Sequence, residues 1–189
     1  MALTRDDIDK MLESGACPIP EGGFMQDKSG LVIHTKKFEH PYVPEGKLKN
    51  RLKYNPINQI IRHRYEESMP ATFEKLCYIK PAHYPKFKPE PFMQMMKEYD
   101  SLKISGYQVL IANDEDASII PILRGNKNAM TLGFFWNNSH VAHKKLCIGI
   151  KAQYYLIRYL PNIGIEQLFL RGGSMQYKTI FDPELRTYG

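Results

Sequence analysis

The pattern of hydrophobic and polar positions is clearest in the second half of the chain. Three runs rich in apolar and β-branched residues cover residues 107–112, 118–123 and 130–136. Turn-forming residues separate them, at residues 113–116 and 125–128. Short β-type runs joined by tight turns are typical of hairpins, so the pattern predicts an antiparallel meander of three strands.

A helical period follows the meander. Residues 144–159 predict a helix, which Pro161 and Gly164 end, and its buried face carries Leu146, Ile150, Tyr154 and Ile157. A further β-type run occupies residues 165–170. The order strand, helix, strand predicts a crossover that places 165–170 parallel to 130–136. Residues 172–174 then turn the chain into a short helix over 175–181, closed by Pro183.

The first ninety residues have a weaker pattern. Thr4 and Asp7 form a capping-box sequence, which predicts a helix that buries Ile8, Met11 and Leu12 and ends at Gly15. The prolines and glycines of residues 18–23 predict a linker.

The remaining elements of the first half are predicted from short runs. Residues 31–35 and 75–80 have the composition of strands, and residues 47–69 have helical spacing that Pro56 interrupts. Residues 83–91 contain three prolines and predict an irregular segment. A helix is expected to start at Pro91, with a buried face of Phe92, Met95, Met96, Tyr99 and Leu102.

Length and composition indicate one folded domain of α/β (α+β) class over residues 1–189. The 189 residues are 43% hydrophobic, and twelve tyrosines, nine phenylalanines and nine methionines argue against disorder. No apolar run approaches the roughly 20 residues that span a bilayer, and the N-terminus does not resemble a signal peptide. The three cysteines form neither a disulfide framework nor a zinc pattern. We therefore expect a cytoplasmic protein with no membrane association.

The predicted crossover also predicts an anion site. Where residues 130–136 and 165–170 end, the sheet can splay, and the helix between them directs unpaired backbone amides into the gap. Residues 137–144 would lie there, and all their charges are basic. The net charge of +6 likewise favours an anionic partner, such as a coenzyme, a nucleic acid or an acidic substrate.

A motif near the C-terminus, together with this order of elements, resembles the pattern of a known superfamily. It reads Gly172-Gly173-Ser174-Met175-Gln176-Tyr177-Lys178-Thr179-Ile180-Phe181. With the elements before it, this stretch resembles the GCN5-related N-acetyltransferase (GNAT) superfamily, and more narrowly its Fem-type and stand-alone acyltransferases. The resemblance covers residues 91–181 and implies a GNAT-like mixed, mostly antiparallel sheet flanked by helices.

The resemblance also implies an activity and a site. It implies transfer of an acyl group, usually acetyl, from an acyl-CoA donor such as acetyl-CoA to an amine acceptor, with no metal. Residues 91–182 would form the acyl-donor core, and residues 1–90 a divergent acceptor-side part. Lys178 would hold a carbonyl or anionic oxygen, and Tyr177 would line the site and could donate a proton. Substrate would lie near Arg171, Gly172, Gly173 and Ser174. The donor would contact Phe135, Trp136, Asn137, Asn138, Ser139, His143, Lys144 and Lys145.

The sequence departs from the superfamily in two respects. The chain ends eight residues after Phe181, so the last two strands common in the superfamily are expected to be absent or replaced by part of the first ninety residues. The usual pyrophosphate loop, a Gln or Arg followed by Gly-x-Gly or Gly-x-Ala, is missing from residues 137–146. Its absence favours a second hypothesis, a non-enzymatic interaction or assembly protein on a GNAT-like scaffold. In that case Tyr177 and Lys178 are a packed aromatic and a surface lysine on a terminal helix.

Basic and aromatic residues support a third hypothesis, nucleic-acid binding or modification. Residues 47–64 and 80–88 interleave lysines, arginines and histidines with tyrosines, which suits phosphate contact and base stacking. A solvated amphipathic helix is the favoured interpretation of residues 47–64, and in the acyltransferase hypothesis either segment could form an acceptor-binding lid. The acceptor therefore stays open between a small molecule, a protein and a modified nucleic acid. Glu66 and Glu67 are the carboxylates considered as a general base.

Two further clusters have structural and functional interpretations. His140, His143 and Cys147 have the spacing of metal ligands on one helix face, but no fourth ligand accompanies them. A histidine pair at a helix start with a buried thiol explains them as well. Residues 114–116 are consecutive carboxylates at a predicted hairpin tip, where solvated turn residues are common.

Overall fold

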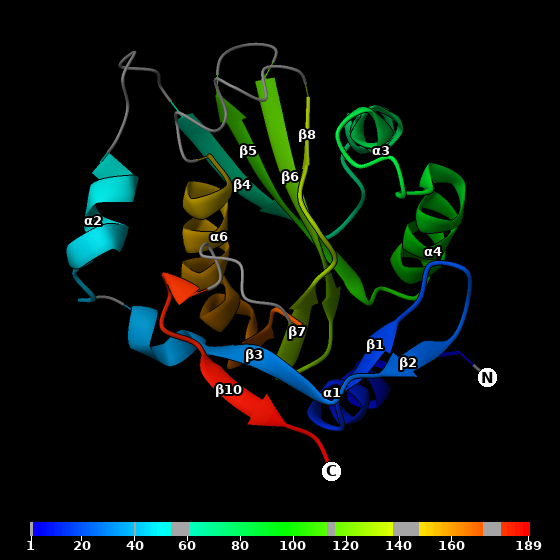
Figure 1. Cartoon of the computed structure of the whole chain (residues 1–189), viewed down its shortest axis with the longest axis horizontal. Helices are drawn as coiled ribbons and strands as arrows, with labels where there is room; N and C mark the ends of the chain where they lie inside the picture. The colour runs from blue at the N-terminus through cyan, green and yellow to red at the C-terminus, as the bar shows by residue number, and fades with distance from the viewer. Residues whose placement is uncertain (1, 40, 54–60, 113–115, 138–147, 172–178) are drawn as a thin grey trace.

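The protein has three layers, a central sheet covered by helices on both faces (Figure 1). The computed structural model describes residues 2–39, 41–53, 61–112, 116–137, 148–171 and 179–189. No helix within these ranges is long and apolar enough to cross a membrane.

The large sheet is mixed and mostly antiparallel. Its strands lie in the order β10 (Glu184–Thr187), β3 (Ser29–His34), β9 (Gln167–Phe169), β7 (Asn128–Thr131), β6 (Asp116–Arg124), β5 (Ser105–Ala112) and β4 (Ile61–Glu66), and β8 (Phe135–Trp136) also pairs with β6. The β7–β9 pair is parallel, whereas the other pairs described are antiparallel. The predicted meander and the predicted parallel crossover are therefore confirmed.

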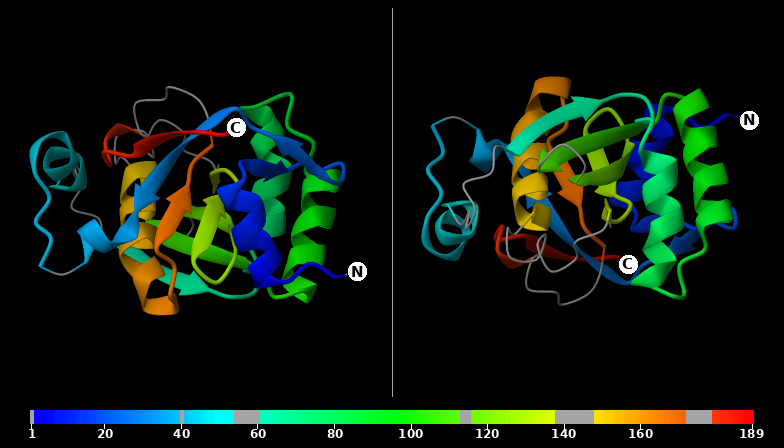
Figure 2. Two further views of the ribbon diagram at one scale, coloured as in Figure 1. Left: turned by 90° about the horizontal axis from the view of Figure 1, so that it is seen from below. Right: turned by 90° about the horizontal axis from the view of Figure 1, so that it is seen from above.

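Helices divide between the two faces of the sheet (Figure 2). One face is covered by α6 (Ile148–Tyr159), beside which α2 (Gly46–Lys53) packs. The other face carries α1 (Arg5–Glu13), α3 (Phe73–Ile79) and α4 (Pro89–Ser101). Three short 3-10 helices complete the described elements: η1 (Thr35–Phe38), η2 (Lys80–Ala82) and η3 (Leu160–Ile163). The predicted start of the α6 helix, residues 144–147, lies outside the described residues.

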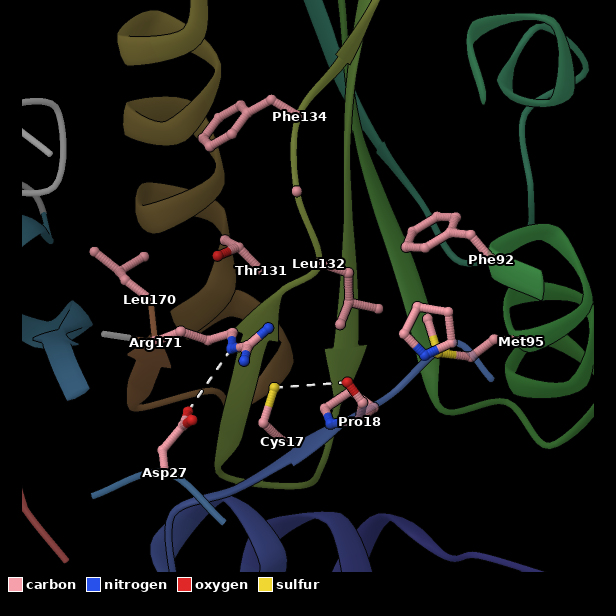
Figure 3. A pocket seen from close by; sticks show the side chains of 12 residues that line it. Cys17, Pro18, Asp27, Phe92, Met95, Thr131, Leu132, Phe134, Leu170 and Arg171 are labelled. Atoms are coloured by element: carbon pink, nitrogen blue, oxygen red, sulfur yellow. Dashed lines mark hydrogen bonds and ion pairs between the residues drawn. The ribbon is translucent and has the colours of Figure 1, made fainter. Parts of the chain in front are cut away.

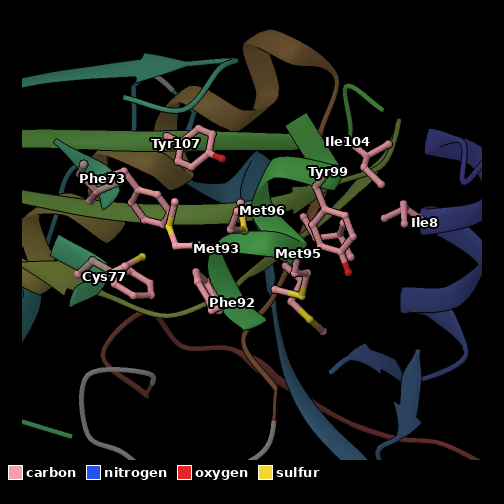
Figure 4. Close-up of a cluster of buried hydrophobic side chains, with 14 of the residues drawn as sticks. Ile8, Phe73, Cys77, Phe92, Met93, Met95, Met96, Tyr99, Ile104 and Tyr107 are labelled. Carbon is pink, nitrogen blue, oxygen red and sulfur yellow. The ribbon is translucent and has the colours of Figure 1, made fainter. Parts of the chain in front are cut away.

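Each face of the sheet has its own hydrophobic core. The α4-side core includes Ile8, Phe73, Phe92, Met96, Tyr107, Val109, Ile119, Met130 and Phe135 (Figure 4). The α6-side core includes Ile33, Leu110, Ile120, Ala129, Leu156, Ile157 and Leu168. Successive residues of a strand point to opposite faces, so the central strands are apolar on both sides, which explains their continuous apolar runs.

The N-terminal helix begins and ends where its sequence predicts. The Thr4 side chain accepts a hydrogen bond from the Asp7 amide, and the Asp7 carboxylate accepts one from the Thr4 amide. Gly15 follows the helix with a φ of +85°. Asp9 joins this helix to the β6–β7 turn, because its carboxylate accepts hydrogen bonds from the amides of residues 126–128.

Three predictions for the first half are wrong. Residues 75–80 are not a strand but belong to α3 and η2, because Phe73, Leu76 and Cys77 are buried at helical spacing. Residues 61–66, predicted as helix, form the edge strand β4. The Pro- and Gly-containing linker is the turn of a hairpin between β1 (Ala16–Pro18) and β2 (Phe24–Gln26). The error at β4 arises because its pairing with β5, which is distant in sequence, overrides local composition.

The far end of the sheet combines both ends of the chain. β3, from the first ninety residues, lies between β9 and β10 and pairs antiparallel with each. β10 was not predicted, since the sequence after Pro183 has no clear strand pattern. The two ends of the chain thus complete the sheet beside the crossover.

Candidate functional site

A β-bulge interrupts the strand predicted over residues 130–136. Thr131 pairs with Ile122, and Phe135 pairs with Ile119. Three residues, 132–134, therefore oppose the two residues 120–121, and this extra residue defines a bulge. The prediction of one continuous strand is corrected to two strands, β7 and β8.

Two residue types explain the bulge. Pro121 lacks an N–H, so it accepts a hydrogen bond from the Leu132 amide (2.8 Å) but cannot return one. Gly133 has a φ of +118°, a backbone conformation that residues with a Cβ rarely adopt. Within the described residues, no acceptor is found for the Gly133 amide N–H. The bulge thus presents an available backbone donor.

The two parallel strands diverge at the same level. β7 and β9 pair from Asn128 with Gln167 up to Met130 with Phe169. Beyond Phe169 the chain stays with β3, with which β9 already pairs: the Leu170 amide donates to the Leu31 carbonyl, and the Leu31 amide donates to the Arg171 carbonyl. On the other side, the bulge and β8 stay with β6. The sheet therefore splays open between residues 131–134 and 170–171.

A cavity of about 480 Å³ occupies this opening (Figure 3). The strand ends contribute Thr131, Leu132, Gly133, Phe134, Leu170 and Arg171, the first hairpin contributes Cys17 and Pro18, and α4 contributes Phe92 and Met95. Pro20 and Asp27 complete the lining. The cavity therefore lies on the face of the sheet covered by α1, α3 and α4, and most of its walls are apolar.

Charge in the cavity is concentrated at one side. The Arg171 guanidinium Nε lies 3.7 Å from the Asp27 carboxylate, and Figure 3 shows the Arg171 side chain extending into the opening. Cys17 is buried, and burial raises the pKa of its thiol to about 11. The thiol is therefore protonated near neutral pH and unsuited to act as a nucleophile.

The described candidate residues have different surroundings. Arg171 lines the cavity. Phe135 is buried in the α4-side core, and Trp136 stands beside the rings of His83 and Tyr84. The Asn137 side-chain oxygen accepts a hydrogen bond from the Ala117 amide (2.7 Å), so it holds the end of β8 to β6.

Most of the other candidates lie outside the described residues. These are the donor-binding candidates Asn138, Ser139, His143, Lys144 and Lys145, the substrate-binding candidates Gly172, Gly173 and Ser174, and the catalytic candidates Tyr177 and Lys178. The same holds for His140, Cys147 and the carboxylates of residues 114–115. Their assigned roles stay predictions. Within the described ranges, no cluster of His, Cys, Asp and Glu could hold a metal ion, and Cys17 and Cys77 are free thiols.

The carboxylates considered as a general base are held by arginines. Glu66 pairs with Arg64 at 2.5 Å, and Glu67 pairs with Arg124 at 2.6 Å. Neither lines the cavity, where the carboxylate is that of Asp27. Sequence reasoning missed Asp27 because the hairpin that carries Cys17 toward the cavity was interpreted as a linker. Pro121 within a β-type run was the available signal for the bulge.

Comparisons with known proteins support the fold. No family model matches the sequence, and no curated protein matches it. Among solved structures, the chain is similar to the C-terminal domain (DUF2156) of a proposed lysylphosphatidylglycerol synthetase from Agrobacterium fabrum, with a TM-score of 0.55 and 12% identity over 97% of this chain and 64% of that one. It is also similar to a conserved protein of unknown function from Bacteroides thetaiotaomicron, with a TM-score of 0.55 and 9% identity over 95% of this chain and 62% of that one.

A weaker overlap, with a TM-score of 0.48 and 6% identity, covers all of this chain and 57% of a tandem GNAT protein from the clavulanic acid biosynthesis pathway. The chain spans less than two thirds of the length of each of these structures. At such identities the likeness concerns the fold alone. The fold that the structure shows is a mixed, mostly antiparallel sheet flanked by helices, with a parallel crossover at which the sheet opens.

Proposed function

We propose that the chain is an N-acyltransferase that moves an acyl group from an acyl-CoA-type thioester to an amine acceptor. The observation that carries the proposal is the opening between β7 and β9, where a cavity meets the bulge amide of Gly133. An opening between parallel strands can receive the extended arm of a thioester donor. An available amide beside it suits the carbonyl oxygen of that thioester.

The proposed reaction is direct transfer. The acceptor amine attacks the thioester carbonyl carbon, the new C–N bond forms, the C–S bond breaks, and the thiolate leaves with the proton released by the amine. The Gly133 N–H would donate to the oxyanion of the tetrahedral intermediate. Such prearranged donors stabilise the transition state. Removal of a single donor from such a site raises the activation free energy by about 3–4 kcal/mol.

The cavity lining indicates what kind of acceptor fits. Its volume of about 480 Å³ lies in the range of small-molecule sites. Phe92, Met95 and Leu170 would contact an apolar body. We therefore propose an amine with an apolar body as the acceptor.

Tyr177 and Lys178 keep the roles that the resemblance implies. Both follow Arg171, which ends the β9 side of the opening, by only a few residues. Lys178 would hold an oxygen of the donor or of the acceptor. Tyr177 would donate its hydroxyl proton to the leaving thiolate and regain the proton that the amine releases. The measurement is the turnover of Lys178→Ala and Tyr177→Phe, which should fall without loss of folding.

Ligand-dependent melting tests the donor. A ligand that binds the folded chain stabilises it by about 2.7 kcal/mol at one hundred times its Kd. Millimolar acetyl-CoA should therefore raise the Tm by several degrees, since ~1 kcal/mol is worth about 2–4 °C in a chain of this size. Thr131→Phe, which fills the cavity, should remove the shift, and Thr131→Val should retain it.

Two results would contradict the proposal. One is the absence of any Tm shift with acetyl-CoA and with longer acyl-CoA species. The other is an equal shift in wild type and Thr131→Phe, which would place the ligand elsewhere. Unchanged turnover in Lys178→Ala would leave the donor site intact and refute the catalytic assignment.

A further inference from the structure

Lys80 lies in an aromatic box directly behind the bulge. Its Nζ is 4.2 Å from the ring centroid of Phe135 and donates a 2.6 Å hydrogen bond to the Phe134 carbonyl. The rings of Tyr84, Phe87 and Trp136 complete the box, at 5.1, 5.4 and 5.8 Å. Among the described residues no carboxylate forms an ion pair with this lysine. The positive charge is therefore balanced by rings and one carbonyl.

Burial in this box changes the ionisation of the amine. It lowers the pKa of Lys80 to about 8, and the Cys77 thiol of α3 offsets part of this effect. The other titratable groups described near the box are the Tyr84 hydroxyl and the His83 ring, which stacks on Trp136, since β8 contributes only the Phe135 and Trp136 rings. At pH 7.5 roughly a quarter of such an amine is neutral, whereas an exposed lysine is about 0.1% neutral. Neutral amines are the nucleophilic form.

The amine lies close to the proposed path of the acyl group. A Cβ atom added at Gly133 would lie 3.5 Å from Lys80 Nζ, and Gly133 itself lines the cavity. Because glycine has no side chain, Gly133 places none between Lys80 Nζ and the cavity.

We propose that Lys80 is an acylation site of this protein, modified by the thioester donor that occupies the cavity. The neutral Nζ attacks the thioester carbonyl carbon, forms the C–N bond and expels the thiolate, which leaves with the proton that Nζ loses. The product is an Nε-acyl-lysine and a free thiol. Delivery from the cavity rests on the proposed donor site, but the reactivity of the amine does not.

The box suits the product better than the ammonium ion. An acylated Nζ keeps one N–H, which can still donate to the Phe134 carbonyl. The acyl methyl group would lie among four rings, and the buried positive charge is removed. An amide is a poor acyl donor, so the modification is a stable mark and not an intermediate of transfer.

Mass spectrometry tests the site. The purified chain is incubated at pH 8 with acetyl-CoA and, separately, with acetyl phosphate, a small donor without a CoA moiety. Peptide mapping then compares Lys80 with Lys86 and Lys88, which are exposed in the same loop. Lys80 should be acetylated about tenfold faster, and its rate should level off above about pH 8, while the rates of Lys86 and Lys88 keep rising.

Variants supply the controls. Lys80→Arg keeps a cation and a donor to Phe134 but should lose the fast label, whereas Lys86→Arg should retain it. Filling the cavity with Thr131→Phe should slow labelling by acetyl-CoA about tenfold and leave labelling by acetyl phosphate unchanged. Circular dichroism confirms that each variant is folded before its rate is compared.

The outcomes separate the two proposals. If acetyl-CoA raises the Tm but neither donor labels Lys80 faster than Lys86 and Lys88, the acylation site is overturned and the donor site stands. If acetyl phosphate labels Lys80 selectively while acetyl-CoA neither labels it nor shifts the Tm, the reactive lysine stands and the proposed function fails. Equal labelling of the three lysines, or unchanged labelling by acetyl-CoA in Thr131→Phe, overturns delivery from the cavity.

Discussion

Single residues decide the chemistry at the opening of the sheet. Pro121 has no N–H to donate to the neighbouring strand, and Gly133 adopts a conformation with positive φ. The chain between β7 and β8 therefore bulges, and the Gly133 amide is left available. Lys80 then donates to the Phe134 carbonyl within the same bulge. The Lys80 side chain therefore hydrogen-bonds a backbone carbonyl of the bulge, although its own positive charge is poorly solvated there.

The ionisation of Lys80 should appear in the pH dependence of stability. Its pKa falls from an ordinary 10.5 to about 8 on folding, so between these values the unfolded chain binds one more proton than the folded chain. The free energy of unfolding then rises with pH across this window and is unaffected below it. Relative to Lys80→Met, wild type should gain about 1–2 kcal/mol between pH 7.5 and 9.5 in urea denaturation.

An exposed lysine is the matched control for that measurement. Lys86→Met removes a lysine from the same loop, and the difference between this variant and wild type should stay flat over the same pH range. A flat difference for Lys80→Met would show that the ammonium ion is as well solvated in the folded chain as in the unfolded chain.

At the scale of elements, β4 pairs along one edge with β5 of the meander, and α6 packs on one of its faces. The His63 ring stacks on Tyr155 at 3.7 Å, and the Tyr65 ring stacks on Tyr159 at 4.5 Å. His63 and Tyr65 are two positions apart, so alternate residues of the strand face the helix. The sequence did not show this period of two clearly, because Ile60 and Ile61 fit a helical spacing. Gly106 on β5 makes room for the Tyr65 ring.

Two glycines of these elements should respond oppositely to the same substitution. A Cβ at Gly106 would lie 1.9 Å from the Tyr65 hydroxyl oxygen, so Gly106→Ala should destabilise the chain by about 1–3 kcal/mol through overpacking. Gly149 in α6 has no described atom within 4 Å of an added Cβ, so Gly149→Ala should stabilise it by roughly 0.5–1 kcal/mol. Urea denaturation measures both, and a neutral Gly106→Ala would mean that the Tyr65 ring moves aside freely.

The whole molecule combines its two halves in shared cores, as a single domain over residues 1–189 requires. The α4-side core contains Ile8 and Phe73 from the first ninety residues together with Phe92 and Phe135 from the second part. The sheet likewise takes β3 and β4 from the first part. We propose that the two parts unfold together, because neither retains a complete core without the other.

Cooperativity can be measured with the one tryptophan of the chain. Trp136 lies beside the Lys80 box and reports locally, whereas far-UV circular dichroism reports on all helices and strands. Urea transitions from the two probes should coincide, as expected for two-state unfolding. A Trp136 transition at clearly lower urea concentration would show that the box and β8 open as a separate unit and would contradict a single cooperative domain.

The sequence alone determined the features that depend on local period. The capping box of α1, the meander of β5, β6 and β7, and the crossover through α6 follow from spacing and turn residues within short windows. The sequence alone also predicted a mixed, mostly antiparallel sheet flanked by helices, which the structure confirms. It did not reveal the hairpin of β1 and β2, whose strands have only three residues each. Nor did it reveal the strand β4, because its partner β5 is distant in sequence.

Tertiary structure alone decided the site. Residues 131–134 and 170–171 form an opening only because the chain after β9 continues along β3 while the bulge and β8 stay with β6, and no local pattern encodes the position of β3. Cys17 and Asp27 reach the cavity through a hairpin. Lys80 owes its lowered pKa to rings from both η2's loop and β8. The physical reason is common to all three: burial and pairing depend on which segments meet, and that is a property of the packed molecule.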